Sequence, residues 1–123
     1  MVKTTKDDDG VWYEFEESPL MSTYLFMFVV GKFESSRATT KHGVELNIYT
    51  PVGRLSEGKY ALDLGQKSLE YFEEYFGIKY PLKKLDLVSL HLMHVRAMEN
   101  WGCITFHDYV ILNDLENQPT ALL

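Results

Sequence analysis

Apolar and polar positions along the chain predict a set of strands around one long helix. Residues 24–30 form a continuous aromatic and β-branched run that Gly31 closes, which is typical of a strand buried on both faces. Residues 44–49 alternate between apolar and polar side chains, which favours a half-buried strand. Residues 85–90 indicate another strand, and residues 102–112 indicate a further extended stretch. The pattern therefore predicts a mixed α/β structure.

The one long helix is predicted over residues 56–76. Ser56 suits the N-cap position, Gly77 suits the left-handed conformation that ends many helices, and Pro81 prevents the helix from resuming. Apolar and small side chains recur at helical spacing and predict one packed face. The members of this face are Ala61, Leu64, Ser68, Leu69, Phe72, Tyr75 and Phe76.

Residues 34–43 separate these elements with a segment rich in Ser, Thr, Arg and Lys, which we interpret as a loop and as the best candidate for a domain boundary. A chain of 123 residues is long enough for one ordinary domain and too short for two complete ones. The hydrophobic share of 46%, with eight glycines and four prolines, excludes a disordered or collagen-like chain.

The charge and the cysteine content narrow the functional classes further. Twelve basic and eighteen acidic residues give a net charge of −6, which lacks the basic footprint of a nucleic-acid binder. The single cysteine, Cys103, makes an intramolecular disulfide impossible. The longest apolar run, residues 25–30, is too short to span a bilayer, and the N-terminus has no apolar signal region. We therefore expect a soluble protein of a reducing compartment, with a cytoplasmic location, no nucleic-acid partner and no membrane segment in this chain.

The sequence contains none of the common catalytic motifs that we searched for. Among the four histidines, His91 and His94 have an i, i+3 spacing, whereas a catalytic zinc helix needs H-E-x-x-H, which does not occur. This spacing favours loop histidines over a metal site. Cys103 lies in an apolar run, which favours a buried structural thiol over a nucleophile. Neither a G-x-S-x-G elbow nor a phosphate-binding glycine loop is present.

The segment around Glu99 is the most informative one. A carboxylate between Met98 and Asn100, followed by Trp101, is a poor core sequence and an unusual solvated loop. From the residues alone, a structural role for Glu99 and Trp101 is favoured over a binding role.

Residues 97–102, Ala-Met-Glu-Asn-Trp-Gly, resemble the Gly-Ala-Met-Glu-Asn-Trp-Gly signature of the zinc aminopeptidases related to aminopeptidase N and puromycin-sensitive aminopeptidase. These enzymes are gluzincin metallopeptidases. Residues 21–25, Met-Ser-Thr-Tyr-Leu, are similar to a strand that ends the family's N-terminal β domain, and residues 48–51 are similar to the start of its catalytic domain. The resemblance extends over residues 12–117. The helix and strand just before the signature are matched by residues 71–77, 80–82 and 85–88.

The resemblance implies a fold and a division into domains. Residues 1–42 correspond to the C-terminal end of the family's N-terminal β domain. Residues 43–123 correspond to the N-terminal part of a thermolysin-like peptidase domain, its first sheet-and-helix part, ending before the zinc-binding helix. The zinc of the complete family enzyme is held by H-E-x-x-H and a later glutamate, and these ligands are absent from this chain.

The resemblance also implies a function for residues 97–100. Glu99 matches the glutamate that binds the free amine of a peptide N-terminus, an ammonium group that a carboxylate shielded from water would recognise by a charge-assisted hydrogen bond. Ala97 and Met98 match backbone positions that line the first-residue pocket, and Asn100 matches a residue that orients the loop. The resemblance thus implies four substrate-binding residues, Ala97, Met98, Glu99 and Asn100. We expect a fragment of a zinc metallo-aminopeptidase, inactive alone. The alternative is a non-catalytic module that binds peptides or a parent enzyme.

Three departures from the family pattern bear on substrate binding. Arg96 stands in place of a glycine and is expected to crowd the site and to compete for Glu99. His-Leu-Met at residues 91–93 replaces Pro-Asp-Phe, and Phe-His-Asp at residues 106–108 replaces Tyr-Arg-Glu. We also expect self-association through exposed sheet edges and an uncovered helix face.

Overall fold

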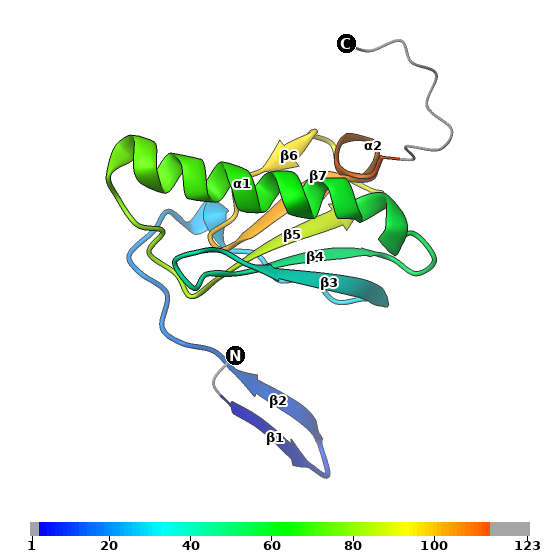
Figure 1. The fold of residues 1–123 in the computed structure, drawn as a ribbon. Helices are drawn as coiled ribbons and strands as arrows, with labels where there is room; N and C mark the ends of the chain where they lie inside the picture. The colour runs from blue at the N-terminus through cyan, green and yellow to red at the C-terminus, as the bar shows by residue number, and fades with distance from the viewer. Residues whose placement is uncertain (1–2, 114–123) are drawn as a thin grey trace.

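A computed structural model describes residues 3–113, which fold into two sheets and a long helix that lies across the larger sheet (Figure 1). The predicted mixed α/β class is confirmed. The strands are β1 (Lys3–Asp7), β2 (Gly10–Glu14), β3 (Phe33–Thr39), β4 (Glu45–Pro51), β5 (Lys84–Leu90), β6 (Ala97–Met98) and β7 (Cys103–His107). The helices are the 3-10 turns η1 (Thr23–Leu25) and η2 (Leu55–Gly58), and the α-helices α1 (Lys59–Phe76) and α2 (Asp108–Ile111).

Strands β3 to β7 form the main sheet, in the order β3-β4-β5-β7-β6. Strands β4, β5 and β7 are parallel, whereas β3 and β6 pair antiparallel with their neighbours. Helix α1 makes the crossover from β4 to β5, as a parallel pair requires. Strands β1 and β2 form a separate hairpin that projects from the main sheet (Figure 1).

The core lies between α1 and one face of the main sheet. Leu46 and Ile48 of β4 are fully buried and pack with Leu62 of α1. A Cβ atom placed on Gly65 would lie 3.1 Å from Leu87 Cδ1, so the missing side chain lets the helix approach the sheet closely. Other members of this core are Leu85, Ile111 and Leu112.

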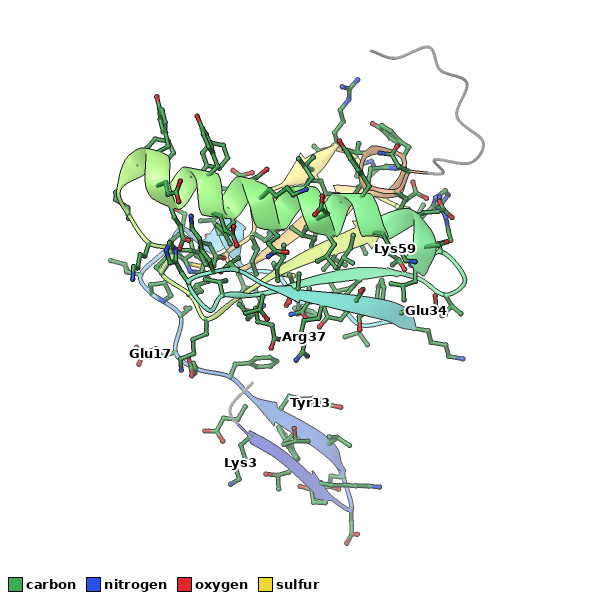
Figure 2. The ribbon with its side chains drawn as sticks, viewed as in Figure 1. Lys3, Tyr13, Glu17, Glu34, Arg37 and Lys59 are labelled. Carbon is green, nitrogen blue, oxygen red and sulfur yellow. The ribbon has the colours of Figure 1, made fainter. Side chains whose placement is uncertain are left out.

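The opposite face of the main sheet carries polar side chains, among them Arg37, which points away from α1 (Figure 2). The Arg37 Nε–H donates to Asn47 Oδ1 at 3.2 Å, and the Asn47 amide donates to Asp86 Oδ1 at 3.0 Å. The Lys84 ammonium donates to the Gly102 carbonyl at 2.8 Å. This polar face therefore connects three strands and the turn that contains Gly102.

Helix α1 differs from its prediction in its start and in its packed face. It begins at Lys59 and not at Ser56, because residues 55–58 form the 3-10 turn η2. Gly77 has the predicted left-handed conformation, with φ of 65°. The residues that face the sheet include Leu62, Gly65, Leu69 and Glu73, whereas four members of the predicted face are exposed. These four are Leu64, Phe72, Tyr75 and Phe76.

Three other predicted segments need correction. The predicted buried strand at residues 24–30 is wrong, because this segment has no ladder partner among the described residues and exposes Phe26, Phe28 and Val30. The predicted loop at residues 34–43 is wrong over most of its length, because β3 occupies Phe33–Thr39. The predicted extended stretch at residues 102–112 ends at His107, because α2 begins at Asp108.

The strands predicted at residues 44–49 and 85–90 are confirmed as β4 and β5. Strands β3 and β4 pair with each other on either side of the predicted boundary at residue 42. The assignment of residues 1–42 and 43–123 to two domains of a longer protein stays a prediction.

Candidate functional site

Strand β6 is the edge strand of the main sheet within residues 3–113. Ala97 pairs with Phe106 and Met98 with Thr105, and the His107 N–H donates to the Arg96 carbonyl at 2.8 Å. In an antiparallel pair, successive residues turn their backbone groups alternately toward and away from the partner strand. Since Arg96 turns its backbone toward β7, the Ala97 N–H and C=O point outward. The edge therefore offers one donor and one acceptor to an incoming extended chain.

Glu99 directly follows this edge strand, and its side chain is exposed. Among residues 3–113, no side chain or backbone group forms a hydrogen bond or an ion pair with the Glu99 carboxylate. The expected shielding from water is therefore not found in this part of the chain. The carboxylate is accessible to an external cation, and an exposed ion pair contributes about 0.2–1 kcal/mol.

Asn100 holds the turn after Glu99 in place. Its side chain is 3% exposed, and its Oδ1 accepts a hydrogen bond from the Thr105 hydroxyl at 3.1 Å. The Asn100 backbone carbonyl accepts from the Cys103 N–H at 3.1 Å, and the Asn100 amide lies 3.5 Å from the Leu25 carbonyl. These bonds fix the turn that carries Glu99. Direct contact of Asn100 with a substrate stays a prediction, as do the substrate contacts of Ala97 and Met98.

Gly102 completes this turn with a φ of 68°, in the left-handed region that favours glycine. A Cβ atom at this position would lie 2.7 Å from Leu82 Cδ1. The Gly102 carbonyl accepts from the Asp86 N–H at 3.0 Å and so ties the turn to β5. Trp101 is 40% exposed, and its backbone N–H donates to the Leu25 carbonyl at 3.3 Å. The signature residues thus form a turn that hydrogen bonds connect to β5, β7 and η1.

Arg96 and Glu99 are not brought together by this fold. Arg96 is exposed, and within residues 3–113 it forms no ion pair with Glu99 or with another carboxylate. Strand alternation places Arg96 with Met98 on the sheet face away from α1, and Ala97 on the face of α1. The expected competition of Arg96 for Glu99 therefore has no support in the described residues.

An ion cluster around Asp108 anchors the loop that leads into β6. Asp108 Oδ2 lies 2.9 Å from His91 Nδ1 and 3.2 Å from the Arg54 guanidinium, and Asp108 Oδ1 lies 2.7 Å from His107 Nδ1. The hydrogen bond with His91 lowers the pKa of the Asp108 carboxyl below its usual value. The sequence analysis missed this cluster, because His91 and Asp108 meet only through the parallel pairing of β5 with β7.

The remaining candidate residues are two histidines and the cysteine. His42 Nδ1 lies 2.6 Å from the buried Glu73 carboxylate, His94 lies exposed in the loop before β6, and burial raises the pKa of the Cys103 thiol. In the described residues, no three His, Cys, Asp or Glu side chains are arranged to hold a metal ion. No helix within residues 3–113 has the length and apolarity needed to cross a membrane.

Comparison with known proteins identifies the class to which this fold and turn belong. The model of the Peptidase family M1 domain matches residues 60–122. The chain therefore belongs to peptidase family M1, and the predicted resemblance is confirmed.

Several relatives are named aminopeptidases. The chain is 47% identical over 107 residues to Aminopeptidase M1-C of Oryza sativa subsp. japonica, covering 87% of this chain and 12% of the relative. It is 45% identical over 100 residues to Puromycin-sensitive aminopeptidase of Caenorhabditis elegans, covering 81% of this chain and 10% of the relative. It is 40% identical over 122 residues to Endoplasmic reticulum aminopeptidase 1 of Homo sapiens, covering 98% of this chain and 13% of the relative. The chain thus spans between 10% and 13% of the length of these curated relatives.

Proposed function

We propose that β6 and the turn after it bind the free N-terminus of a peptide, as the amine-anchoring part of an aminopeptidase site. The observation that carries this proposal is the position of Glu99, whose carboxylate is exposed, has no partner within residues 3–113 and follows an edge strand with outward backbone groups. Membership of peptidase family M1 and the aminopeptidase names of the relatives support it.

The proposed binding combines two contacts. The peptide ammonium donates to the Glu99 carboxylate in a charge-assisted hydrogen bond. The peptide backbone then continues along β6 and pairs with the outward N–H and C=O of Ala97, as peptides do when they add a strand to a sheet edge. Asn100 and Gly102 hold Glu99 at the end of the strand. Because both contacts are exposed, we expect weak binding of short peptides.

We further propose that the isolated chain binds peptides without hydrolysing them. The family implies a zinc ion in its complete enzymes, and this chain lacks the H-E-x-x-H motif that holds it. A mixture of the purified chain, zinc and an aminoacyl fluorogenic substrate should release no fluorophore, and metal analysis should find no stoichiometric zinc. One zinc per chain together with hydrolysis would overturn this part of the proposal.

The amine contact is tested with Trp101 as the reporter. In a Trp12→Phe background, Trp101 is the single tryptophan, and it lies next to the turn. Titration with a tetra-alanine amide should change its fluorescence, whereas the N-acetylated peptide should bind at least several-fold more weakly. Glu99→Gln should remove this difference, and Glu14→Gln, an exposed glutamate on β2, should preserve it. Equal binding of both peptides to the unsubstituted Glu99 protein would contradict an amine anchor and favour a general peptide-binding module.

A further inference from the structure

The outer edge of β6 carries a cation with no partner in the described residues. Arg96 is exposed, directly precedes Ala97, and forms no ion pair within residues 3–113. Its cross-strand neighbour is His107, whose N–H bonds the Arg96 carbonyl and whose ring is held by Asp108. The side chain directly across from Arg96 on β7 therefore carries no negative charge that would neutralise the guanidinium.

The direction of the bound peptide follows from the proposed function, on which this inference rests. With its ammonium at Glu99, the peptide runs past Ala97 toward Arg96, which makes it antiparallel to β6. If its first residue lies across from Met98, its third residue lies across from Arg96. If its first residue lies across from Glu99, the fourth residue takes that place. Residues directly opposite in an antiparallel pair share a face, with their Cβ atoms about 4.5–5.5 Å apart.

We infer that Arg96 is a specificity-determining residue, which selects peptides with an acidic side chain at the third or fourth position. An Asp or Glu at that position projects to the same sheet face as Arg96, away from α1, and pairs with the guanidinium. The opposite-charge pair stabilises the added strand, whereas a Lys or Arg at that position is repelled. For an exposed ion pair, the preference for Glu over Gln should be about two- to fivefold in affinity.

The test is a scan of C-terminally labelled hexapeptides by fluorescence anisotropy with the full chain. Each peptide has alanine elsewhere and a single Glu, Gln or Lys at one of positions two to five. Tightest binding is expected for Glu at position three or four, and the advantage over Gln should shrink as the salt concentration rises, since salt screens exposed charges. Each peptide is also measured in its N-acetylated form, which reports separately on the amine anchor.

Two variants assign the preference to Arg96. Arg96→Gln should remove it, and Arg96→Glu should reverse it, so that Lys at the same position binds more tightly than Glu. Lys32→Glu is the matched control, because it makes the same change in net charge on an exposed residue that precedes β3 at the opposite edge of the main sheet. It should leave the preference unchanged.

The possible failures are distinguishable. Binding that depends on the free amine but shows no preference for Glu overturns the role of Arg96 alone. A Glu preference that persists in Arg96→Gln, or that Lys32→Glu also removes, likewise overturns it. If neither the free nor the acetylated peptides bind, the proposed function and this inference fall together.

Discussion

Asn100 and Thr105 share a buried hydrogen bond of 3.1 Å, in which the Thr105 hydroxyl donates to the Asn100 side-chain carbonyl. Asn100 is 3% exposed and Thr105 is 1% exposed. The bond joins the turn after Glu99 to the middle of β7, so the position of the carboxylate depends on the main sheet. A buried polar group that loses its partner is costly, which makes this bond a sensitive point of the turn.

Asn100→Ala should therefore lower the free energy of unfolding by about 1–3 kcal/mol, because the Thr105 hydroxyl loses its acceptor in a buried place. Urea unfolding followed by far-UV circular dichroism measures the loss. The double variant Asn100→Ala/Thr105→Val should lose less stability than the sum of the losses in the two single variants. The reason is that Thr105→Val removes the hydroxyl that Asn100→Ala leaves without an acceptor. Strict additivity of the two changes would show that the bond contributes nothing.

Gly102→Ala should destabilise the protein for two reasons, its left-handed backbone and the crowding of Leu82. Gly53 is a matched control, because its φ is also positive, at 87°, while a Cβ atom there would meet nothing within 4 Å. Gly53→Ala should cost about 1–2 kcal/mol from the backbone alone, and Gly102→Ala should cost more. Equal losses in urea unfolding would mean that Leu82 moves aside without cost.

Hydrophobic patterning correctly predicted β4 and β5, whose side chains are largely buried. It failed where the structure of a segment depends on the neighbouring strand. Residues 24–30 are apolar enough for a buried strand, but strand formation also needs a neighbouring ladder, which no pattern within the segment reveals. Strand β3 was predicted as a loop because its composition is polar. Its Ser, Thr and Arg side chains suit an edge strand with a polar face, and the same composition is typical of a loop.

Helix α1 shows why the packed face was misassigned. Aromatic side chains dominate the pattern, so the predicted face followed Phe72 and Phe76, whereas the sheet side contains Gly65 and the carboxylate of Glu73. Glu73 is buried because His42 and the Tyr80 N–H satisfy it, at 2.6 Å and 2.8 Å. Such partners come from distant segments, and helical spacing contains no information about them.

The part of the candidate site that lies in one continuous segment was predictable from the sequence. Residues 97–102 were identified by their signature, and the structure places them at a sheet edge as one turn. The bonds from this turn to Leu25 and to Asp86 join segments far apart in the chain, as does the pairing of His91 with Asp108. The contacts of Asp86 and Asp108 follow from the parallel pairing of β5 with β7, which a single sequence does not specify.

Stability at acid pH should depend on Asp108. His91 holds the pKa of the Asp108 carboxyl below its usual value. Because the folded pKa lies below the unfolded one, the ionised carboxylate stabilises the fold above about pH 4, and this contribution is lost as the pH falls through the folded pKa. Urea unfolding between pH 7 and pH 3 should show a steeper loss for the natural protein than for Asp108→Asn.

Two comparisons complete this pH prediction. The pKa of the Glu73 carboxyl is also lowered, chiefly by its hydrogen bond with His42, so part of the acid sensitivity should survive in Asp108→Asn. Asp63→Asn, which removes an exposed ion pair with Lys67 on α1, should lower the free energy of unfolding at pH 7 by less than Asp108→Asn does. An Asp108→Asn protein with the natural acid dependence would show that the ion cluster does not stabilise the fold.

The exposed aromatic side chains of α1 should make the isolated chain self-associate. Tyr71 stacks on Tyr75 and Phe72 stacks on Phe76, and all four are at least half exposed. Contiguous apolar surface of this kind promotes association, so sedimentation velocity should detect oligomers that dissociate on dilution. Phe72→Lys combined with Phe76→Lys should raise the monomer fraction with little change in stability, whereas Phe28→Lys, which changes an exposed aromatic outside α1, should have a smaller effect. A natural chain that stays monomeric at all concentrations, with one sharp unfolding transition, would contradict this prediction.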